Sequence, residues 1–378
     1  MHRVKVYKDA PSSHVGLNYS FIGNQKQKLR MLFCVGLCVV WVLLIFTLPV
    51  FAAKFEPPDG KTIVVIGQEK DEIALYKNAM GGQSASGYML YTSVSGMQGL
   101  TQAWRGTGCG DSGTHDLQDW VNNYPNSVVQ IGLFIEPIAS INNGSSDNKI
   151  RSIANILRNT RKPVFLRIGY EFDGPWNQVE PAPYKTAWQR IVNIFRGVNV
   201  GGQAITPVNN VAFVWHSAAY YTYNGYPISD WYPGDSFVDW IAVSWFGWGS
   251  DSDNNVAANA REVVKTFAQN HSKPLMIGEA APRIYFHPKK INAWNEWFLK
   301  VFNWIESNNV KAFSYINQNW LRQGMWDPVC GGGDDWGNTR VQISGSRVIR
   351  LWRNKLTEPR YLNASPTLYS QIGFTPND

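Results

Sequence analysis

Residues 163–173 read Pro-Val-Phe-Leu-Arg-Ile-Gly-Tyr-Glu-Phe-Asp. The run begins as a continuous apolar stretch, which is typical of a parallel strand buried on both faces. It ends with the polar side chains of Arg167, Tyr170, Glu171 and Asp173. A carboxylate at the end of a buried strand costs free energy unless a partner neutralises it or a reaction uses it. The stretch therefore predicts a buried strand whose C-terminal end carries functional groups.

Seven similar apolar runs occur along the chain, at residues 63–68, 88–92, 128–136, 211–217, 238–246, 274–280 and 311–318. Amphipathic stretches with helical spacing lie between or after them, at residues 146–160, 184–198, 256–270, 288–308 and 349–356. The connections after the second and fifth runs are irregular. Eight buried strands alternating with helices favour a closed α/β structure, the (β/α)8 or TIM barrel, over a doubly wound open sheet. We expect one such barrel over residues 54–378.

Active sites of these barrels lie at the C-terminal ends of the strands. The seventh run ends Met-Ile-Gly-Glu279, so Glu171 and Glu279 are expected on opposite sides of one barrel mouth. Hydrolysis of a glycosidic bond needs one carboxylic acid to protonate the leaving oxygen and a second carboxylate at the anomeric carbon. Arg167 and Arg283 are candidate sources of the positive charge that would keep one carboxylate ionised. The pair predicts a glycoside hydrolase.

Three segments carry a resemblance to a known family: LRIGYEFDGPWN at 166–177, DWYPGDSFVDWIAVSWFGWG at 230–249 and LMIGEAAPR at 275–283. In their order they resemble glycoside hydrolase family 26, which includes β-mannanases and β-1,3-xylanases. The resemblance covers most of residues 60–360. It implies a retaining mechanism through a covalent glycosyl-enzyme, with Glu171 as acid/base and Glu279 as nucleophile.

Two positions depart from the family pattern. Mannanases of the family carry His directly before the acid/base, where this chain has Tyr170. The family usually has Tyr near the nucleophile on the sixth strand, where this chain has Trp245. The string Gly-Tyr-Glu-Phe-Asp-Gly is more similar to the β-1,3-xylanase branch. The resemblance thus implies endo-hydrolysis of a β-linked polysaccharide of the β-1,3-xylan or β-mannan type, and mixed β-glucans stay open.

The chain contains 17 Trp residues, and the face of a Trp ring is a suitable surface for stacking a sugar. We expect substrate contacts from side chains at or just beyond strand ends: Arg167, Tyr170, Asp173, Trp176, Asn177, His216, Trp245, Trp248, Arg283 and Trp320. Trp326 and Trp336 lie on the loop after the eighth run. The alternative for each Trp is a core position beneath a long loop.

The N-terminal region has the pattern of a membrane-targeting segment. Residues 1–30 hold a net charge of +5 out of +7 for the chain, and residues 31–53 contain no charged side chain. Such a run is long enough to span a bilayer, and the positive-inside rule leaves the basic tail cytoplasmic. A cleaved signal peptide is the alternative. With either, residues 54–378 reach the lumen or the exterior, as a membrane-held or a secreted protein.

Cysteine usage agrees with an oxidising compartment. The expected barrel holds only Cys109 and Cys330. We predict a disulfide between them, because the loops after strands two and eight flank strand one at the same face of a barrel. Three Asn-x-Ser/Thr sequons offer glycosylation sites at Asn143, Asn270 and Asn363.

Other classes of function are less compatible with the sequence. The positive charge is concentrated in the N-terminal tail, so nucleic-acid binding is not expected. We expect no cofactor and no metal site, since no His/Cys cluster has zinc-ligand spacing. The expected partners are the polysaccharide or oligosaccharide substrate and the membrane, and the protein is expected to be a monomer. Two alternatives stay open: a catalytically inactive carbohydrate-binding barrel and a membrane-anchored glycosyltransferase, for which Asp251 and Asp253 would bind a metal.

Overall fold

The computed structural model describes residues 53–81, 85–177, 179–219, 225–246, 255–282, 293–331 and 336–376, with the backbone alone for 255–257. They belong to one of the two units into which the chain divides, Ala52–Asp378. The predicted basic tail and residues 31–52 of the predicted membrane segment lie outside the described residues, as do Trp248 and Arg283. No helix within the described ranges is long and apolar enough to cross a membrane.

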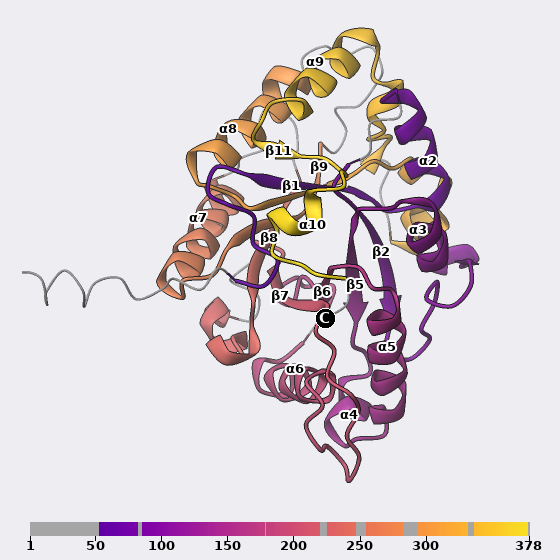
Figure 1. Cartoon of the computed structure of the whole chain (residues 1–378), viewed down its shortest axis with the longest axis vertical. Coiled ribbons are helices and arrows are strands. Elements are labelled where there is room, and N and C mark those ends of the chain that lie inside the picture. Colours follow the sequence, from indigo (N-terminus) through magenta and orange to yellow (C-terminus); the bar gives the residue numbers. More distant parts are fainter. Residues whose placement is uncertain are drawn as a thin grey trace, which may run out of the picture. The chain divides into compact units, whose positions relative to one another are not determined.

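Eight parallel strands close into a barrel (Figure 1). They are β1 (Thr62–Gly67), β2 (Gly87–Ser93), β5 (Val128–Phe134), β6 (Val164–Ile168), β7 (Val211–Ser217), β8 (Trp240–Phe246), β9 (Leu275–Ala281) and β10 (Ala312–Ile316). Strand β10 pairs with β1 to complete the ring, with Ile63 opposite Ala312. A short strand, β11 (Tyr361–Leu362), pairs with the start of β1. The predicted (β/α)8 barrel is confirmed, and each predicted apolar run forms one of its strands.

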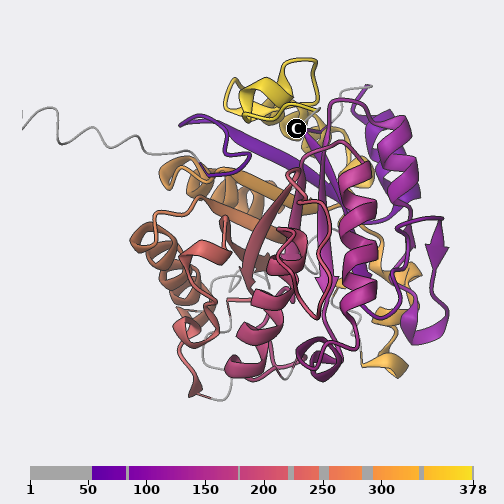
Figure 2. The same ribbon diagram turned by 60° about the horizontal axis from the view of Figure 1, so that its bottom comes forward.

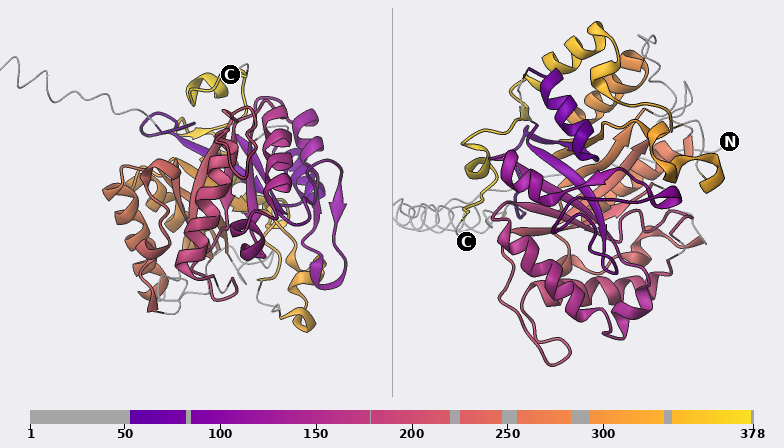
Figure 3. Two further views of the ribbon diagram at one scale, coloured as in Figure 1. Left: turned by 90° about the horizontal axis from the view of Figure 1, so that it is seen from below. Right: turned by 90° about the vertical axis from the view of Figure 1, so that its right-hand side faces the viewer.

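Helices surround the strands on the outside of the barrel (Figure 2, Figure 3). They are α2 (Lys70–Ala79), α3 (Leu117–Asn123), α4 (Ile138–Asn142), α5 (Asp147–Asn159), α6 (Pro181–Phe195), α7 (Asn255–Asn270), α8 (Leu299–Ser307) and α9 (Ser346–Leu356), whereas α10 (Leu368–Gln371) lies at the N-terminal end of the barrel. Pro181 begins α6, where its missing N–H costs no hydrogen bond. A π-helical turn, Trp294–Phe298, leads into α8. The sequence did not predict α2, α3, α4 or α10.

The two irregular connections have different structures. After β2 the chain forms an antiparallel pair, β3 (Trp104–Arg105) with β4 (Thr114–His115), before α3 begins. Asp116 caps α3, since its carboxylate accepts a hydrogen bond from the Asp119 N–H at 3.1 Å. After β7 the described residues contain only the 3-10 turns Ile228–Trp231 and Asp235–Phe237. Both connections lack the periodic apolar face from which a helix is predicted.

Alternation along the strands separates two apolar cores. Inward side chains such as Val65 and Phe165 fill the barrel, and outward ones such as Ile66 and Leu166 pack beneath the helices. Among the described residues, seven Trp side chains are completely buried: Trp120, Trp188, Trp215, Trp231, Trp240, Trp297 and Trp352. For these seven residues the core alternative to a sugar contact therefore holds.

The N-terminal end of the barrel is covered by the first and last described segments. Phe374 packs edge-to-face on Phe55 with ring centroids 5.5 Å apart, and Phe55 packs on Phe165 at 6.0 Å. The Tyr369 hydroxyl of α10 donates to the Ser127 carbonyl, just before β5, at 3.0 Å. The two ends of the described chain thus meet at the barrel end opposite the C-terminal strand ends.

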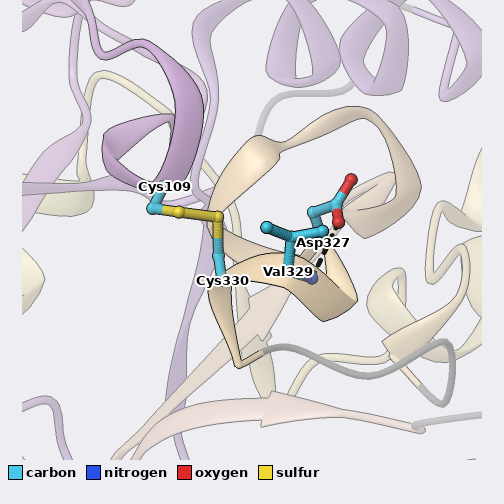
Figure 4. The surroundings of a disulfide bond; sticks show 4 residues. All are labelled: Cys109, Asp327, Val329 and Cys330. Carbon is cyan, nitrogen blue, oxygen red and sulfur yellow. Dashed lines mark hydrogen bonds between the residues drawn. A yellow bond between two sulfur atoms is a disulfide. The ribbon is translucent and has the colours of Figure 1, made fainter.

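A disulfide joins the loops that follow β2 and β10 (Figure 4). Cys109 and Cys330 lie in short 3-10 turns, with their Cα atoms 5.2 Å apart and 221 residues between them in sequence. The backbones approach closely nearby, because a Cβ at Gly324 would lie 2.3 Å from the Gly108 carbonyl oxygen. The predicted pairing is confirmed.

Replacing both cysteines, Cys109→Ser with Cys330→Ser, is expected to lower the free energy of unfolding by about 2–4 kcal/mol, because the unfolded chain regains the entropy of a long closed loop. Thermal unfolding with and without a thiol reductant measures the effect. The reductant should lower the unfolding midpoint of the wild type and leave that of the double variant unchanged. Equal unfolding midpoints for the wild type and the double variant, both measured without reductant, would contradict this expectation.

Candidate active site

Glu171 lies on a tight turn after β6 rather than on the strand itself. The strand ends at Ile168, earlier than the predicted run, and both Gly169 (φ 51°) and Glu171 (φ 55°) have left-handed backbone conformations. For a residue other than Gly this conformation costs roughly 1–2 kcal/mol. Hydrogen bonds hold the turn: the Glu171 N–H donates to the His216 carbonyl at 2.8 Å, and Asn177 Nδ2 donates to the Glu171 carbonyl at 2.6 Å. The turn carries the carboxylate above the end of the strand.

Glu279 lies at an irregularity of β9. Val243 of β8 pairs with Ile277, but Ser244 pairs with Glu279, so Gly278 is an extra residue in the ladder. A bulge of this kind redirects the side chains that follow it. The Gly278 carbonyl accepts a hydrogen bond from Gln130 Nε2 at 2.8 Å, which fixes the bulge from inside the barrel.

Arg167 is completely buried beneath the mouth. Its Nη1 donates to Glu279 Oε1 in a short ion pair and lies 3.2 Å from His216 Nδ1. The rings of Tyr91 and Tyr170 lie against the guanidinium, with centroids 5.2 and 5.3 Å from its Cζ atom. Because an Arg side chain stays protonated, these contacts place a permanent positive charge beside Glu279.

Glu171 has different surroundings. Its side chain is nearly buried, and Ser244 Oγ donates to Glu171 Oε1 at 2.5 Å. Burial and the neighbouring Glu279 charge raise the pKa of Glu171 well above its usual range, while the hydrogen bond from Ser244 and the charge of Arg167 oppose the shift in part. Glu171 therefore keeps its proton to a higher pH than an ordinary glutamate.

Like Arg167, which was also expected to contact substrate, two further residues instead support the site from below. His216 is completely buried, and burial together with the Arg167 charge lowers its pKa well below the usual range, so the ring is neutral. Asp173 is also completely buried, and its carboxylate accepts from Ser217 Oγ at 2.7 Å and from the Ala218 N–H at 2.6 Å. Both polar side chains have protein partners, which corrects the prediction that they face the sugar.

The predicted aromatic contacts divide into exposed and buried positions. Trp176 is 57% exposed and Tyr170 is half-buried at the mouth. Trp245 does not face the mouth, because it packs on Trp304 of α8 at 5.3 Å and beneath Arg261 of α7. Since Ser244 points inward, strand alternation directs the next side chain outward. The prediction that Trp245 lies in the site is thus corrected.

Trp320 belongs to an aromatic cluster at the mouth, between the ends of β8 and β10. Its ring centroid lies 5.0 Å from that of Trp326 and 4.9 Å from that of Trp336, and Phe246 packs on Trp336 at 5.1 Å. Trp320 is only 2% exposed, whereas Trp326 and Trp336 are partly exposed. The cluster presents its two loop tryptophans to the solvent rather than Trp320.

Sequence reasoning missed three residues that shape the site. Tyr91 lies within an apolar run and resembles a core aromatic, so it gave no signal. Gln130 and Ser244 are polar residues inside apolar runs, and both side chains point into the barrel. A polar side chain in a run that is otherwise buried on both faces is the signal that would have indicated Gln130 and Ser244.

The arrangement combines one glutamate whose pKa is raised with a second glutamate paired to a buried cation. This combination suits proton transfer to a leaving group together with attack on a carbon centre. In the part of the chain that the structure describes, no three His, Cys, Asp or Glu side chains come together to hold a metal ion.

Comparison with known proteins agrees with this geometry. The family model described as glycosyl hydrolase family 26 matches residues 79–318. The chain belongs to this family. It is 28% identical over 342 residues to a β-1,3-xylanase of Vibrio sp., covering 85% of this chain and 70% of that protein. A β-1,3-xylanase of Alcaligenes sp. is also 28% identical, over 341 residues, covering 85% and 68%.

Solved structures of the family share the fold. A double mutant of the endo-β-1,4-mannanase of Cellulomonas fimi superposes with a TM-score of 0.55 at 16% identity, covering 82% of this chain and 73% of that one. The β-mannanase of Bacteroides ovatus gives 0.53 at 13% identity, covering 81% and 91%. Membership of the family makes this chain a glycoside hydrolase, and its relatives act on β-linked polysaccharides.

The raised pKa of Glu171 predicts a pH-dependent gain in stability for Glu171→Gln. Between the ordinary glutamate pKa and the raised value, the native state holds a proton that the unfolded chain releases. The wild type therefore loses stability as pH rises through this window, by up to about 1.4 kcal/mol per pH unit. The variant has no such loss, so its advantage should grow with pH and then level off.

Urea unfolding at a series of pH values measures this difference, and the exposed Glu358→Gln is the matched control. A constant difference between wild type and Glu171→Gln across the series would show that Glu171 titrates as an ordinary carboxyl.

Proposed function

We propose that the protein is a retaining endo-β-1,3-xylanase in which Glu171 is the acid/base and Glu279 the nucleophile. The observation that carries this proposal is the unequal environment of the two carboxylates. Glu279 is paired with the fully buried Arg167, whereas Glu171 has an uncharged hydroxyl, that of Ser244, as its close partner. Divergent environments of this kind are how one site keeps one carboxyl protonated and the other ionised.

The proposed reaction has two displacements. In the first, Glu171 gives its proton to the glycosidic oxygen, the bond to the leaving sugar breaks, and a Glu279 oxygen bonds to the anomeric carbon. In the second, the ionised Glu171 takes a proton from water, whose oxygen displaces Glu279 from that carbon. Each displacement inverts the anomeric centre, so its configuration is retained. Arg167 stabilises the negative charge of Glu279 before the first step and after the second.

β-1,3-Xylan is favoured over β-mannan as substrate. The two relatives named β-1,3-xylanase match 85% of the chain at 28% identity, whereas the two mannanases resemble it in fold at 16% identity or less. Tyr170 stands where family mannanases carry His, and its ring packs on Tyr91 at 5.2 Å beside the carboxylates. β-Mannan is the second candidate, supported by the similarity in fold.

We assign the sugar contacts to side chains that the fold leaves accessible at the mouth. These are Tyr170, the exposed Trp176, and Trp326 and Trp336 of the aromatic cluster. Trp248 and Arg283 follow the ends of β8 and β9 in sequence, and we retain them as proposed contacts. The inactive-barrel and glycosyltransferase alternatives are disfavoured, because the chain keeps both carboxylates and belongs to a hydrolase family.

The full-length protein, made in an oxidising host, is expected to release new reducing ends from β-1,3-xylan faster than from β-mannan or β-glucan. Glu171→Gln should lower the rate by about 10²–10⁴-fold, because the leaving oxygen loses its proton donor. Glu279→Gln should abolish turnover, because no nucleophile remains.

A covalent trap separates the roles of the two glutamates. A 2-fluoro-xylobioside with a dinitrophenolate leaving group should inactivate the wild type, and mass spectrometry should find the added sugar on Glu279. A label on Glu171 would refute the assignment of Glu279 as the nucleophile. Cleavage of β-mannan alone would refute β-1,3-xylan as the substrate. Absence of activity on every polymer would favour the carbohydrate-binding alternative.

We also propose that residues 31–53 anchor the protein in a membrane as an uncleaved span, with the barrel in the lumen or outside the cell as a monomer. The disulfide is compatible with that compartment. Asn143 and Asn270 have exposed side chains and are the proposed glycan acceptors. Asn363 Nδ2 donates to the Leu356 carbonyl at 2.9 Å, so it is the poorer acceptor.

Membrane association can be tested by alkaline carbonate extraction of host membranes. The wild type is expected to stay in the pellet, because 23 uncharged residues bury enough apolar surface to span the bilayer. The variant Val42→Lys with Ile45→Lys should move to the supernatant, and Asn143→Gln serves as a control that leaves the span intact. A wild type found in the supernatant and shortened at its N-terminus would mean that the segment is a cleaved signal peptide.

A further inference from the structure

Buried hydrogen bonds connect the two proposed catalytic carboxylates through three intervening side chains. Arg167 Nη1 contacts both Glu279 Oε1 and His216 Nδ1, the latter at 3.2 Å. His216 Nε2 lies 3.1 Å from Ser244 Oγ, and Ser244 Oγ lies 2.5 Å from Glu171 Oε1. Arg167 and His216 are completely buried, and Ser244 is 3% exposed. The chain of contacts thus runs beneath the mouth from strand β9 to the turn after β6.

Arg167 determines the direction of every hydrogen bond in this chain. A guanidinium has donors and no acceptor, so His216 Nδ1 must accept from it. The ring is neutral, and its single hydrogen is therefore on Nε2 and is donated to Ser244 Oγ. Ser244 Oγ thus accepts from His216, and its single hydrogen is donated to Glu171 Oε1. Reversing any one of these bonds would bring two donor hydrogens face to face.

We propose that His216 and Ser244 are positioning residues that place the transferable proton of Glu171 on Oε2. This rests on the proposed function, in which Glu171 is the acid/base. Because Oε1 accepts from Ser244, it acts as the carbonyl oxygen of the protonated carboxyl, and the acidic hydrogen occupies the other oxygen. After proton transfer the same hydrogen bond stabilises the carboxylate, so the chain assists both displacements.

Ser244 is an uncharged hydrogen-bond donor to Glu171 in a site that also contains charged side chains. The charged and titratable groups around Glu171 and Ser244 include Glu279 on β9, Arg167, Tyr170 and Asp173 of the β6 segment, and His216 on β7. The ring of His216 fits beside the bulge only because position 278 is Gly, where a Cβ would lie 2.8 Å from His216 Nε2. The backbone of β9 thus makes room for the imidazole that orients Ser244.

The test removes the Ser244 hydroxyl and follows the Glu171 carboxyl directly. In the full-length protein with ¹³C-labelled glutamate carboxyl groups, Glu171→Gln assigns the resonance and a pH titration gives its midpoint. Ser244→Ala is expected to raise the midpoint by about one pH unit, because the carboxylate loses a charge-assisted hydrogen bond. Ser244→Thr keeps a hydroxyl and should restore the wild-type midpoint.

Ser314→Ala is the matched control, since Ser314 is also a buried barrel serine but donates to Gln130 Oε1, at 2.6 Å. It should leave the Glu171 midpoint unchanged. An unchanged midpoint in folded Ser244→Ala would overturn the proposal and make the hydroxyl a packing element. If Ser244→Ala does not fold, Ser244→Cys replaces it, because a thiol is a weaker donor, and the same criterion applies.

Kinetics give a second readout. Ser244→Ala should lose about tenfold in kcat/KM on the polymer and little on a dinitrophenyl glycoside of the same sugar, whose leaving group needs no proton. Equal losses on both substrates would contradict a positioning role. If the wild type hydrolyses neither substrate, the proposed function fails, while the carboxyl titration still decides whether Ser244 donates to Glu171.

Discussion

The centre of this barrel is organised around a positive charge that has no access to water. Arg167 is completely buried, and a guanidinium cannot give up its proton to avoid the cost of desolvation. Its neighbours must therefore supply negative charge, acceptors or π-faces. The negative charge comes from Glu279, the acceptor is His216 Nδ1, and the π-faces are those of Tyr91 and Tyr170. The ion pair of Glu279 and the tautomer of the imidazole both follow from this one side chain.

Backbone irregularities next to glycine position both carboxylates. Gly169 begins the left-handed turn that carries Glu171, and Gly278 is the extra residue of the bulge before Glu279. Regular strands would direct alternate side chains into the barrel or out of it, and neither carboxylate would reach the mouth in the same way. The two carboxylates thus follow two strand ends, and the turn and the bulge place them in different surroundings.

The barrel and its carboxylate pair could be predicted from the sequence because both depend on local patterns. Continuous apolar runs marked the strands, and glutamates at two strand ends marked the mouth. Trp245 was misplaced because a strand buried on both faces carries apolar residues on both, so its composition does not tell inward side chains from outward ones. His216 and Asp173 looked like sugar contacts, since burial beneath the mouth depends on loops whose paths the sequence does not specify. Tyr91 was missed because an aromatic in a strand resembles core.

The contact between Phe55 and Phe374 brings both ends of the described chain to the barrel end remote from the mouth. A short linker between them would therefore require little extra chain, and new termini could be opened in an exposed loop elsewhere. The fold is thus suited to circular permutation. For the same reason a carbohydrate-binding module or an affinity tag fused after α10 would leave polysaccharide access at the other end unobstructed.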